Sequence, residues 1–356
     1  MTDNLDPDTA AALAGGTVIP AHPLALTADR LLDEDGQRRL TRYYADAGVG
    51  GIAVGVHTTQ FEIRDPAIGL YEPVLRLAAE ELDAGEASIG RAFVRVAGLV
   101  GPTASAVAEA ETAVGLGYHL GLLSMAGWGD APEPDILAGV EAVTEVIDVF
   151  GFYLQPAVGG RLFSPGFWHE FVQIPGVRAI KVAPFDRYAT IDVVRAVAEA
   201  GRAGDLALYT GNDDNIVADL LTGFRFSGRT LRVVGGLLGQ WAVWPAAAVE
   251  LLEAIKALGQ APVGIPADLL TVGADLTDAN AAVFDAANGF AGCIPGINEV
   301  LRREGVMAGR WCLDPALELS PGQAEAIDRV TAAYPHLTDA AAARTRLGVT
   351  SHAEIP

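Results

Sequence analysis

Lysine is almost absent from this chain. Only Lys181 and Lys256 are lysines among the 24 lysine and arginine residues. Lys256 lies in an ordinary helical stretch, where a solvated side chain is expected. Lys181 lies in Val177–Ala183, a short β-branched run between prolines that predicts an interior strand. Since lysine is rarely buried unless it is paired, a functional role for Lys181 stands beside two plainer explanations, codon bias and a strand-end side chain that reaches solvent.

A lysine inside a core has unusual chemistry. Burial disfavours the charged ammonium form, so the pKa of the amine falls and the neutral amine becomes a nucleophile. This chemistry suggests a Schiff base between Lys181 and a carbonyl substrate.

The chain is also poor in cysteine and lacks the common motifs of nucleotide, zinc and serine-hydrolase sites. Cys293 and Cys312 give neither a disulfide framework nor a metal-ligand spacing, so a reducing cytoplasm is the default location. No Gly-x-x-x-x-Gly-Lys loop, Gly-x-Ser-x-Gly elbow, His-Glu-x-x-His or Cys-x-x-Cys occurs. We expect no metal or organic cofactor, because in Schiff-base chemistry the protonated imine is itself the electron sink.

Positive charge is scarce as well. The formal net charge is −21 at pH 7, which argues against nucleic acid and anionic membranes as partners. No run of about 18 uncharged apolar residues predicts a transmembrane helix, and the acidic N-terminus lacks the order of a signal peptide. With 51% hydrophobic and 19% charged residues, the composition is typical of a globular protein.

Short apolar runs alternate with Ala/Leu/Glu-rich stretches of helical period. Eight strands are expected at Thr17–Pro20, Gly51–Val56, Ala92–Ala97, His119–Met125, Phe150–Gln155, Val177–Ala183, Leu206–Tyr209 and Leu231–Val234. Helices are expected between them near Glu34–Ala47, Ala67–Leu82, Ala104–Leu116, Asp135–Val149, Pro165–Gln173, Ile191–Gly201 and Asp214–Thr222. Eight strands that alternate with helices predict a parallel sheet, and eight strands close a (β/α)8 TIM barrel of about 250 residues.

A doubly wound open sheet is the competing architecture. It would carry a glycine fingerprint after the first strand, where this chain has Pro20-Ala-His-Pro23 instead.

Beyond Trp244 the pattern is purely helical, at Pro245–Leu258, Asp275–Ala287, Pro295–Glu304 and Pro321–Ala333. We therefore expect an N-terminal tail over residues 1–14, a barrel over 15–258 and a C-terminal helical extension over 259–356.

Two residues on successive expected strands suit imine chemistry. Tyr153 precedes Lys181 by 28 residues, and neighbouring strands lie about 4.8 Å apart, so equivalent levels would place both side chains within reach of one substrate. A tyrosine hydroxyl can act as acid and base while a carbinolamine forms and dehydrates. The alternative for Tyr153 is a core aromatic whose hydroxyl finds a backbone partner.

Further polar groups follow the expected strand ends, where barrel active sites collect. The hydroxyls of Thr58 and Thr59 could bind a carboxylate beside the reacting carbonyl, or could satisfy their own turn. His57, next to them, is either a ligand-binding residue or a hydrogen-bonded structural histidine. The turn that begins at Gly211 could bind an anion, or Asp213 and Asp214 could cap the next helix.

These residues resemble the dihydrodipicolinate synthase/N-acetylneuraminate lyase family of class I aldolases. Tyr153-Leu-Gln-Pro156 matches the family's Tyr-x-x-Pro signature, and Ala179-Ile-Lys181 matches the strand that presents its Schiff-base lysine. The segment Val49–Thr59 resembles the family's Gly-Thr-Thr-Gly-Glu region, and Tyr209–Asp214 resembles the end of its seventh strand. The resemblance covers roughly residues 15 to 300.

The resemblance implies an enzyme and a set of roles. Lys181 would form the imine with pyruvate or another 2-oxo acid, and Tyr153 would move protons. The Thr58/Thr59 region would hold the carboxylate, helped by the backbone near Gly211 and Val234. The family fold is a (β/α)8 barrel with C-terminal helices and is commonly tetrameric. The resemblance therefore implies a homo-oligomer, a dimer or a tetramer, for this chain.

Three departures from the family pattern narrow the expected reaction. The second strand is followed by Val-His-Thr-Thr-Gln-Phe-Glu rather than Gly-Thr-Thr-Gly-Glu. The arginine that follows Tyr-x-x-Pro in the synthases is missing, since Arg161 comes later. The aromatic pair that a neighbouring subunit supplies in the synthases is also missing, and Trp128 is the nearest aromatic in that region. These departures predict a lyase other than a true dihydrodipicolinate synthase.

The expected function is therefore an aldolase or a dehydratase/hydratase-aldolase that acts on a 2-oxo acid. Two alternatives stay open. The altered second-strand motif also suits a barrel that binds a 2-oxo acid or sugar acid without turnover. A phosphosugar aldolase, with Gly211 and Gly235-Gly236 around a phosphate, ranks last because no basic residue follows either turn closely.

Overall fold

Eight parallel strands form a nearly closed barrel in the computed structural model, which describes residues 5–259 and 264–340. The neighbouring strands in the sheet are, in order, β1 (Val18–Pro20), β10 (Gly235–Leu238), β7 (Ala207–Thr210), β6 (Val177–Ala183), β5 (Asp148–Leu154), β4 (Leu120–Ser124), β3 (Val94–Val100) and β2 (Gly51–Val54). The ends of this sheet meet where Ala21 pairs with Ala53 and the His22 N–H donates to the Ala53 carbonyl at 2.8 Å.

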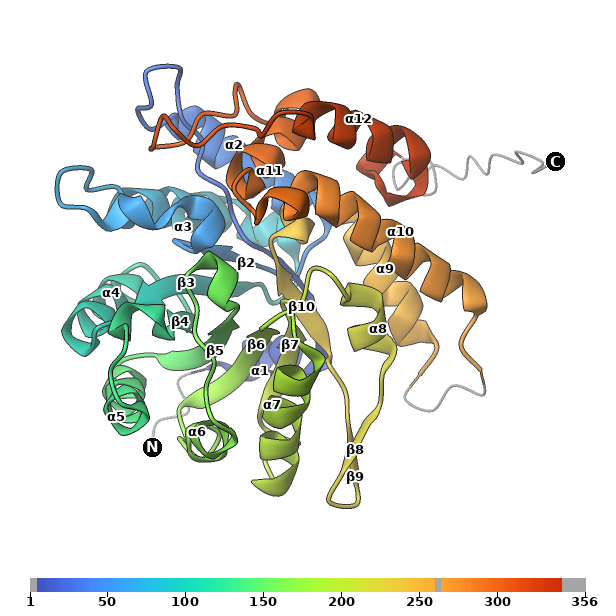
Figure 1. Cartoon of the computed structure of the whole chain (residues 1–356). Coiled ribbons are helices and arrows are strands. Elements are labelled where there is room, and N and C mark those ends of the chain that lie inside the picture. The colour runs from blue at the N-terminus through green and yellow to red at the C-terminus, as the bar shows by residue number, and fades with distance from the viewer. Residues whose placement is uncertain (1–4, 260–263, 341–356) are drawn as a thin grey trace.

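Helices follow the strands and cover the outside of the barrel (Figure 1). They are α2 (Glu34–Ala47), α3 (Tyr71–Ile89), α4 (Thr103–Gly115), α5 (Glu133–Thr144), α6 (Pro165–Phe171), α7 (Arg187–Glu199), α8 (Ile216–Leu221) and α9 (Pro245–Ala257). The ends of α2 show the local cause: the Asp33 carboxylate caps the Gly36 N–H, and Gly48 ends the helix in the left-handed region. The predicted (β/α)8 fold is confirmed.

The core has two layers, and each strand divides its side chains between them. On β6, Ala179 and Ala183 point into the barrel, while Ile180 and Val182 point toward the surrounding helices. This alternation follows from the period of two along a strand. It decides which side chains can meet inside the barrel.

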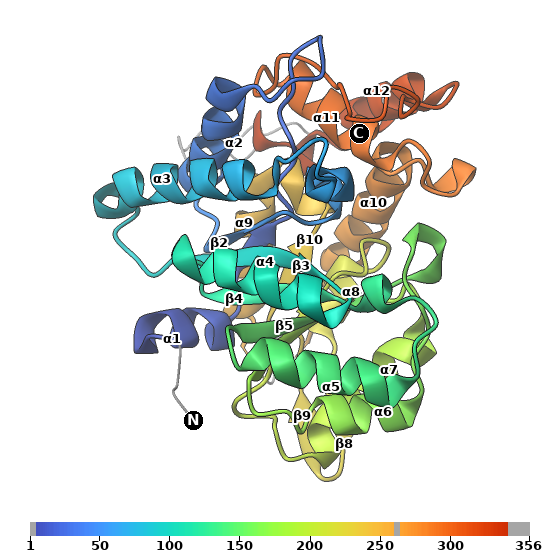
Figure 2. The same ribbon diagram turned by 90° about the vertical axis from the view of Figure 1, so that its left-hand side faces the viewer.

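The N-terminal residues form a helix within the stretch expected to be a tail. Helix α1 (Pro7–Gly15) begins at Asp6, whose carboxylate accepts from the Asp8 and Thr9 N–H groups. Leu13 packs into the inner layer of the barrel, and its carbonyl accepts from the Tyr209 hydroxyl at 2.8 Å. Figure 2 shows α1 away from the C-terminal helices. The helix therefore covers the end of the barrel at which the strands begin.

The eighth barrel strand differs from the prediction. Leu231–Val234 was expected to form it, but the strand is β10, Gly235–Leu238. The preceding residues form a two-stranded hairpin, β8 (Phe224–Phe226) and β9 (Arg229–Leu231), which pairs antiparallel outside the barrel. Gly235 and Gly236, which were expected to follow the eighth strand, therefore lie within it.

The C-terminal region is helical, as the sequence predicts. Its main helices are α10 (Ala267–Val283), α11 (Cys293–Arg303) and α12 (Gln323–Ala333), which gather on one side of the barrel in orange to red in Figure 1. Over the stretches 5–259 and 264–340, no helix combines the length and the apolar character needed to cross a membrane.

Candidate functional site

Lys181 lies inside the barrel near the carboxyl end of β6. Its neighbours two residues away, Ala179 and Ala183, belong to the inner layer, and the Lys181 side chain is only 7% exposed. The amine nitrogen lies 4.2 Å from the centroid of the Phe152 ring, a distance suited to a cation–π contact. Within the described residues, the amine makes no ion pair and no hydrogen bond.

Burial changes the acidity of this amine. It lowers the pKa of Lys181 from the ordinary 10.5 to about 8, while the nearby Asp213 carboxylate and Cys293 sulfur oppose the shift. With a pKa near 8, roughly one amine in ten is neutral at pH 7, against fewer than about one in a thousand for an ordinary lysine. The site therefore holds a usable fraction of nucleophile at neutral pH.

Gly211 lies directly against the lysine side chain. A Cβ atom on Gly211 would come within 2.6 Å of the Lys181 Cε and 2.7 Å of the Ala183 Cβ. The Gly211 N–H donates to the Val182 carbonyl at 2.8 Å, which holds this backbone beside β6. The prediction that Gly211 belongs to the site region thus has a structural reason: only a residue without a side chain leaves room for Lys181.

Asp213 is a second titratable group of the site, and it follows β7. It is 6% exposed, and its Oδ1 accepts from the Gln240 backbone N–H at 2.8 Å. Burial raises the pKa of Asp213 from 3.8 to about 7, against the Gln240 hydrogen bond and the Lys181 charge, which lower it. Both members of the Lys181–Asp213 pair are thus shifted toward their neutral forms, and the protonation of each depends on the charge of the other.

His57 is close enough to Lys181 for the lysine charge to affect its pKa. It opens a short 3-10 helix, η1 (His57–Thr59), after β2, and its ring lies 5.9 Å from the Phe61 ring between centroids. Burial, together with the smaller effect of the Lys181 charge, lowers the pKa of His57 to about 4. His57 is therefore a neutral imidazole at neutral pH, able to donate or accept one hydrogen bond at each ring nitrogen.

The hydroxyls of Thr58 and Thr59 do not offer a donor to a ligand. The Thr59 Oγ1 donates to the His22 carbonyl at 2.6 Å and accepts from the Gly55 and Val56 N–H groups. The Thr58 Oγ1 donates to the same carbonyl at 3.2 Å. A hydroxyl has a single donor hydrogen, and here both donors are already used. The expectation that these hydroxyls bind a carboxylate is therefore wrong. They hold the end of β2 to the segment after β1.

The Tyr153 side chain points from β5 toward the surrounding helices, whereas the Lys181 side chain points from β6 into the barrel. The residue at the level of Lys181 is Phe152, because the pairing of β5 with β6 shifts by one residue between Val149 and Phe150. The Tyr153 ring packs 4.6 Å from Trp168 in the helix-facing layer. The expectation that Tyr153 and Lys181 reach one substrate is therefore wrong, and the alternative, a core aromatic, holds.

Val234 is also remote from the amine. It precedes β10, its N–H donates to the Leu208 carbonyl at 2.9 Å, and it lines a cavity of about 720 Å³ together with Leu5 and Leu13. This cavity lies beneath α1 at the amino ends of the strands. The expected role of Val234 fails because the eighth strand begins one residue after it.

Ser124 lies within the expected fourth strand, His119–Met125, and no role was predicted for it. It ends β4, is 2% exposed, and its Oγ has no hydrogen-bond partner within the described stretches. Ser124 pairs in register with Phe152, which pairs with Lys181. The only sequence signal was the position of a serine at a strand end.

The C-terminal region reaches the same site through Cys293. This residue begins α11, is buried, and interacts electrostatically with Lys181 and Asp213. Burial raises the pKa of the Cys293 thiol far above its ordinary value, so the sulfur is a neutral thiol. Helix α11 thus covers the carboxyl end of the barrel beside the amine.

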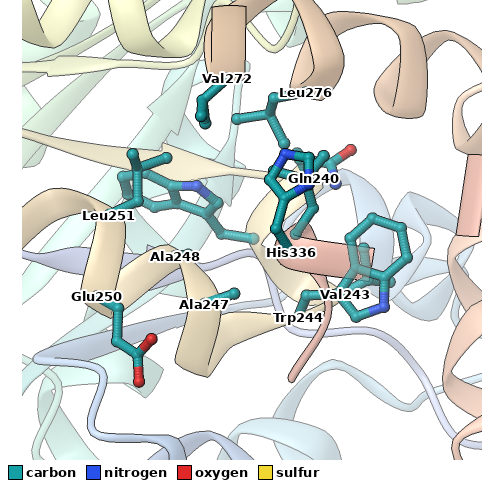
Figure 3. A pocket seen from close by; sticks show the side chains of 12 residues that line it. Gln240, Val243, Trp244, Ala247, Ala248, Glu250, Leu251, Val272, Leu276 and His336 are labelled. Carbon is teal, nitrogen blue, oxygen red and sulfur yellow. The ribbon is translucent and has the colours of Figure 1, made fainter. Parts of the chain in front are cut away.

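A separate cavity of about 190 Å³ lies between α9 and α10 (Figure 3). It is mainly apolar, with Leu251, Val272 and Leu276 among its lining residues. Gln240 lines it as well, and the backbone N–H of Gln240 is the group that holds Asp213. None of the residues predicted to bind substrate borders this cavity.

No group of three or more histidine, cysteine, aspartate or glutamate side chains suited to a metal ion occurs across residues 5–259 and 264–340. The groups that surround Lys181 are instead one carboxyl, one imidazole, one thiol and one phenyl ring. The arrangement can place a neutral amine beside a proton donor inside an enclosed barrel. An amine nucleophile and a proton donor are the two groups that nucleophilic attack on a carbonyl requires.

Solved structures share this architecture. No protein-family model matches the sequence, and no curated protein matches it. The fold is that of the dihydrodipicolinate synthase and N-acetylneuraminate lyase structures. Dihydrodipicolinate synthase from Oceanobacillus iheyensis superposes with a TM-score of 0.73 and 18% identity over 91% of this chain and 97% of that one.

Two structures solved with pyruvate resemble this chain to a similar degree. N-acetylneuraminate lyase from Fusobacterium nucleatum, complexed with pyruvate, has a TM-score of 0.70 and 18% identity over 91% of this chain and 98% of its own. A prophage protein of the dihydrodipicolinic acid synthase family from E. coli K12, also with pyruvate, has a TM-score of 0.72 and 18% identity over 92% and 99%. These likenesses confirm the predicted resemblance in fold.

Proposed function

We propose that the protein is a Schiff-base-forming lyase that acts on pyruvate or another 2-oxo acid, either as an aldolase or as a dehydratase/hydratase-aldolase. The observation that carries the proposal is Lys181, a buried amine inside the barrel with a lowered pKa and no ion pair among the described residues. Two of the neighbouring structures were solved in complex with pyruvate, which agrees with this chemistry.

The reaction would begin at the amine. The neutral Nζ of Lys181 attacks C2 of the 2-oxo acid, the carbonyl oxygen takes up a proton, and the nitrogen loses one, which gives a carbinolamine. Protonation of its hydroxyl group then releases water and leaves the protonated imine. The imine accepts the electron pair when a bond at C3 or beyond is broken, so no metal or organic cofactor enters the scheme.

Asp213, in place of Tyr153, is the proposed acid and base. It is the carboxyl group with the largest charge effect on Lys181. Its raised pKa keeps a proton on part of the population at neutral pH, which a general acid requires. His57, neutral and close to Lys181, would hold a hydrogen bond to the substrate oxygen or to a water between them.

Reductive trapping tests the proposal. The protein is incubated with pyruvate and with a panel of other 2-oxo acids, reduced with borohydride, digested and mapped by mass spectrometry. The expected adduct lies on Lys181 and disappears in Lys181→Arg. Lys256→Arg is the matched control, since Lys256 donates to the Gly16 carbonyl and Glu253 away from the site. An adduct on Lys256, or none with any acid, would contradict the proposal.

A second candidate is a barrel that binds a 2-oxo acid or sugar acid without turnover. Two observations favour it: the outward orientation of Tyr153 and the internal hydrogen bonds of the Thr58 and Thr59 hydroxyls. Release of pyruvate from any candidate aldol, at a rate that Lys181→Arg abolishes, would exclude it. Trapping at Lys181 without turnover of any aldol would favour it.

We also propose that the chain assembles into dimers or tetramers and works in the cytoplasm, as the resemblance and the cysteine content predict. Light scattering of the purified protein coupled to size exclusion gives the assembly directly. A mass equal to the 37.0 kDa of one chain at micromolar concentration would contradict the first expectation.

A further inference from the structure

The Ser124 hydroxyl is a buried polar group that the protein itself does not satisfy. Its Oγ has no partner within the described part of the chain, and the residue is 2% exposed. Leaving a buried donor unpaired is unfavourable, so most buried polar groups have partners and an exception needs an explanation. A ligand that arrives at this position would supply one.

Ser124 lies on the inner face of the barrel at the level of the amine. Leu120 and Leu122, on the same face of β4, belong to the inner layer. In register, Ser124 pairs with Phe152 and Phe152 pairs with Lys181. The serine hydroxyl, the phenyl ring and the amine therefore form one row across β4, β5 and β6.

The amine lies close to the ring in the middle of this row. Its nitrogen lies 4.2 Å from the centroid of the Phe152 ring, on the strand between Ser124 and Lys181. Adjacent strands lie about 4.8 Å apart, so the Cα atoms of Ser124 and Lys181 are separated by about 9–10 Å.

We propose that Ser124 binds the carboxylate of the 2-oxo acid held at Lys181, with the Phe152 ring beneath the planar imine. The inference rests on the proposed function and specifies the orientation of its substrate. The hydroxyls of Thr58 and Thr59 already donate to the His22 carbonyl. Ser124 is the hydroxyl with an unused donor, and a carboxylate is the acceptor that gains most from it.

Electrostatics favours the same orientation. Asp213 follows β7, on the other side of β6 from Ser124. A substrate carboxylate placed toward β4 is thus kept away from the Asp213 carboxyl group, whereas the opposite orientation would bring two acidic groups together. The reacting carbon then faces the carboxyl group that supplies protons.

The test compares two carbonyl compounds that differ in the carboxylate. Pyruvate and acetone are each trapped at Lys181 by borohydride reduction, and the half-saturating concentration of each is measured for the unmodified protein and for Ser124→Ala. Loss of one charge-assisted hydrogen bond predicts a rise of about tenfold or more for pyruvate and a change below about twofold for acetone. Ser124→Thr keeps the hydroxyl and should retain most of the pyruvate affinity.

A structural role for Ser124 predicts a different pattern. It would change trapping of pyruvate and acetone alike, and that result overturns the proposal, as does an unchanged pyruvate concentration in Ser124→Ala. Ser124→Cys, which is nearly isosteric and a weak donor, provides the same comparison if the alanine variant does not fold. Absence of any adduct in the unmodified protein would overturn the proposed function as well, whereas trapping that is insensitive to Ser124 overturns this inference alone.

Discussion

Replacement of Gly211 by alanine tests the arrangement of the amine most directly. In the structure, an added Cβ would lie 2.6 Å from the Lys181 Cε, 2.9 Å from its Cγ and 2.7 Å from the Ala183 Cβ. Ordinary contacts between such carbon atoms are 3.4–4 Å, so the overlap is close to 1 Å. The lysine side chain can yield by changing rotamer, but Ala183 can yield only with its strand.

The expected size of the effect follows from overpacking. An added methyl group in a packed interior costs about 1–3 kcal/mol. For a chain of this length that loss lowers the melting temperature by roughly 1–4 °C. Because the easiest relief moves the amine away from Phe152, we expect the initial rate of pyruvate trapping at Lys181 to fall by about tenfold or more.

Gly151→Ala is the matched control. Its Cβ would come within 2.6 Å of Phe171, on the helix-facing side of β5, so it overpacks the molecule without contacting Lys181. Both variants are measured by thermal unfolding and by trapping rate per folded protein. Similar loss of melting temperature with loss of trapping only in Gly211→Ala supports the geometry. Equal trapping in the two variants would refute it.

Further predictions concern proton transfer and the reassigned residues. The trapping rate should rise with pH and level off above about 8, since the lowered pKa of Lys181 sets the neutral fraction; an inflection above pH 10 would contradict burial of the amine. Asp213→Asn removes a charge that raises the pKa of Lys181, so the inflection should move to lower pH while turnover falls. Tyr153→Phe should change the trapping rate by less than about threefold, because the ring packs against Trp168 outside the barrel; a hundredfold loss would restore Tyr153 to the site. Thr59→Val should cost about 1–3 kcal/mol in urea unfolding, since three hydrogen bonds of the Thr59 hydroxyl are lost, and should leave the ratio of pyruvate to acetone trapping unchanged.

The sequence predicted the barrel well because each strand and helix carries its own pattern. Val177–Ala183 and Glu34–Ala47 have the predicted bounds, since a β-branched run and a capped amphipathic helix are strong local signals. The eighth strand was missed because its residues, Gly-Gly-Leu-Leu, have poor strand propensity. Its glycines are required by packing: a Cβ on Gly235 would meet the Thr17 backbone, and one on Gly236 would meet Trp241.

The candidate site was predicted only in part, because a spacing along the chain does not fix the face of a strand. Gly211 lies against Lys181, and its expected part in holding a carboxylate stays a prediction. The spacing of 28 residues between Tyr153 and Lys181 would bring them level in a regular pair of strands, yet the shift between Val149 and Phe150 puts Phe152 there instead. A shift of one residue exchanges the two faces of a strand, and no local residue pattern announces it.

Asp213 and Ser124 show a different limit. Their importance comes from burial and from partners that are distant in sequence, such as the Gln240 N–H on Asp213. A sequence shows that a carboxyl group and a hydroxyl are present, but it does not show that folding buries them away from solvent. Only the packed structure shows which polar groups are satisfied and which are left for a ligand.

The position of Cys293 on helix α11 bears on when, during synthesis of the chain, the surroundings of Lys181 become complete. A ribosome releases every barrel strand before it releases α11, so a nascent barrel would carry its lysine without the buried Cys293 near it. Reactivity of that lysine toward carbonyl metabolites would then be acquired last, when the C-terminal helices dock. The proposed chemistry of Lys181 would then depend on the finished chain and not on the barrel by itself.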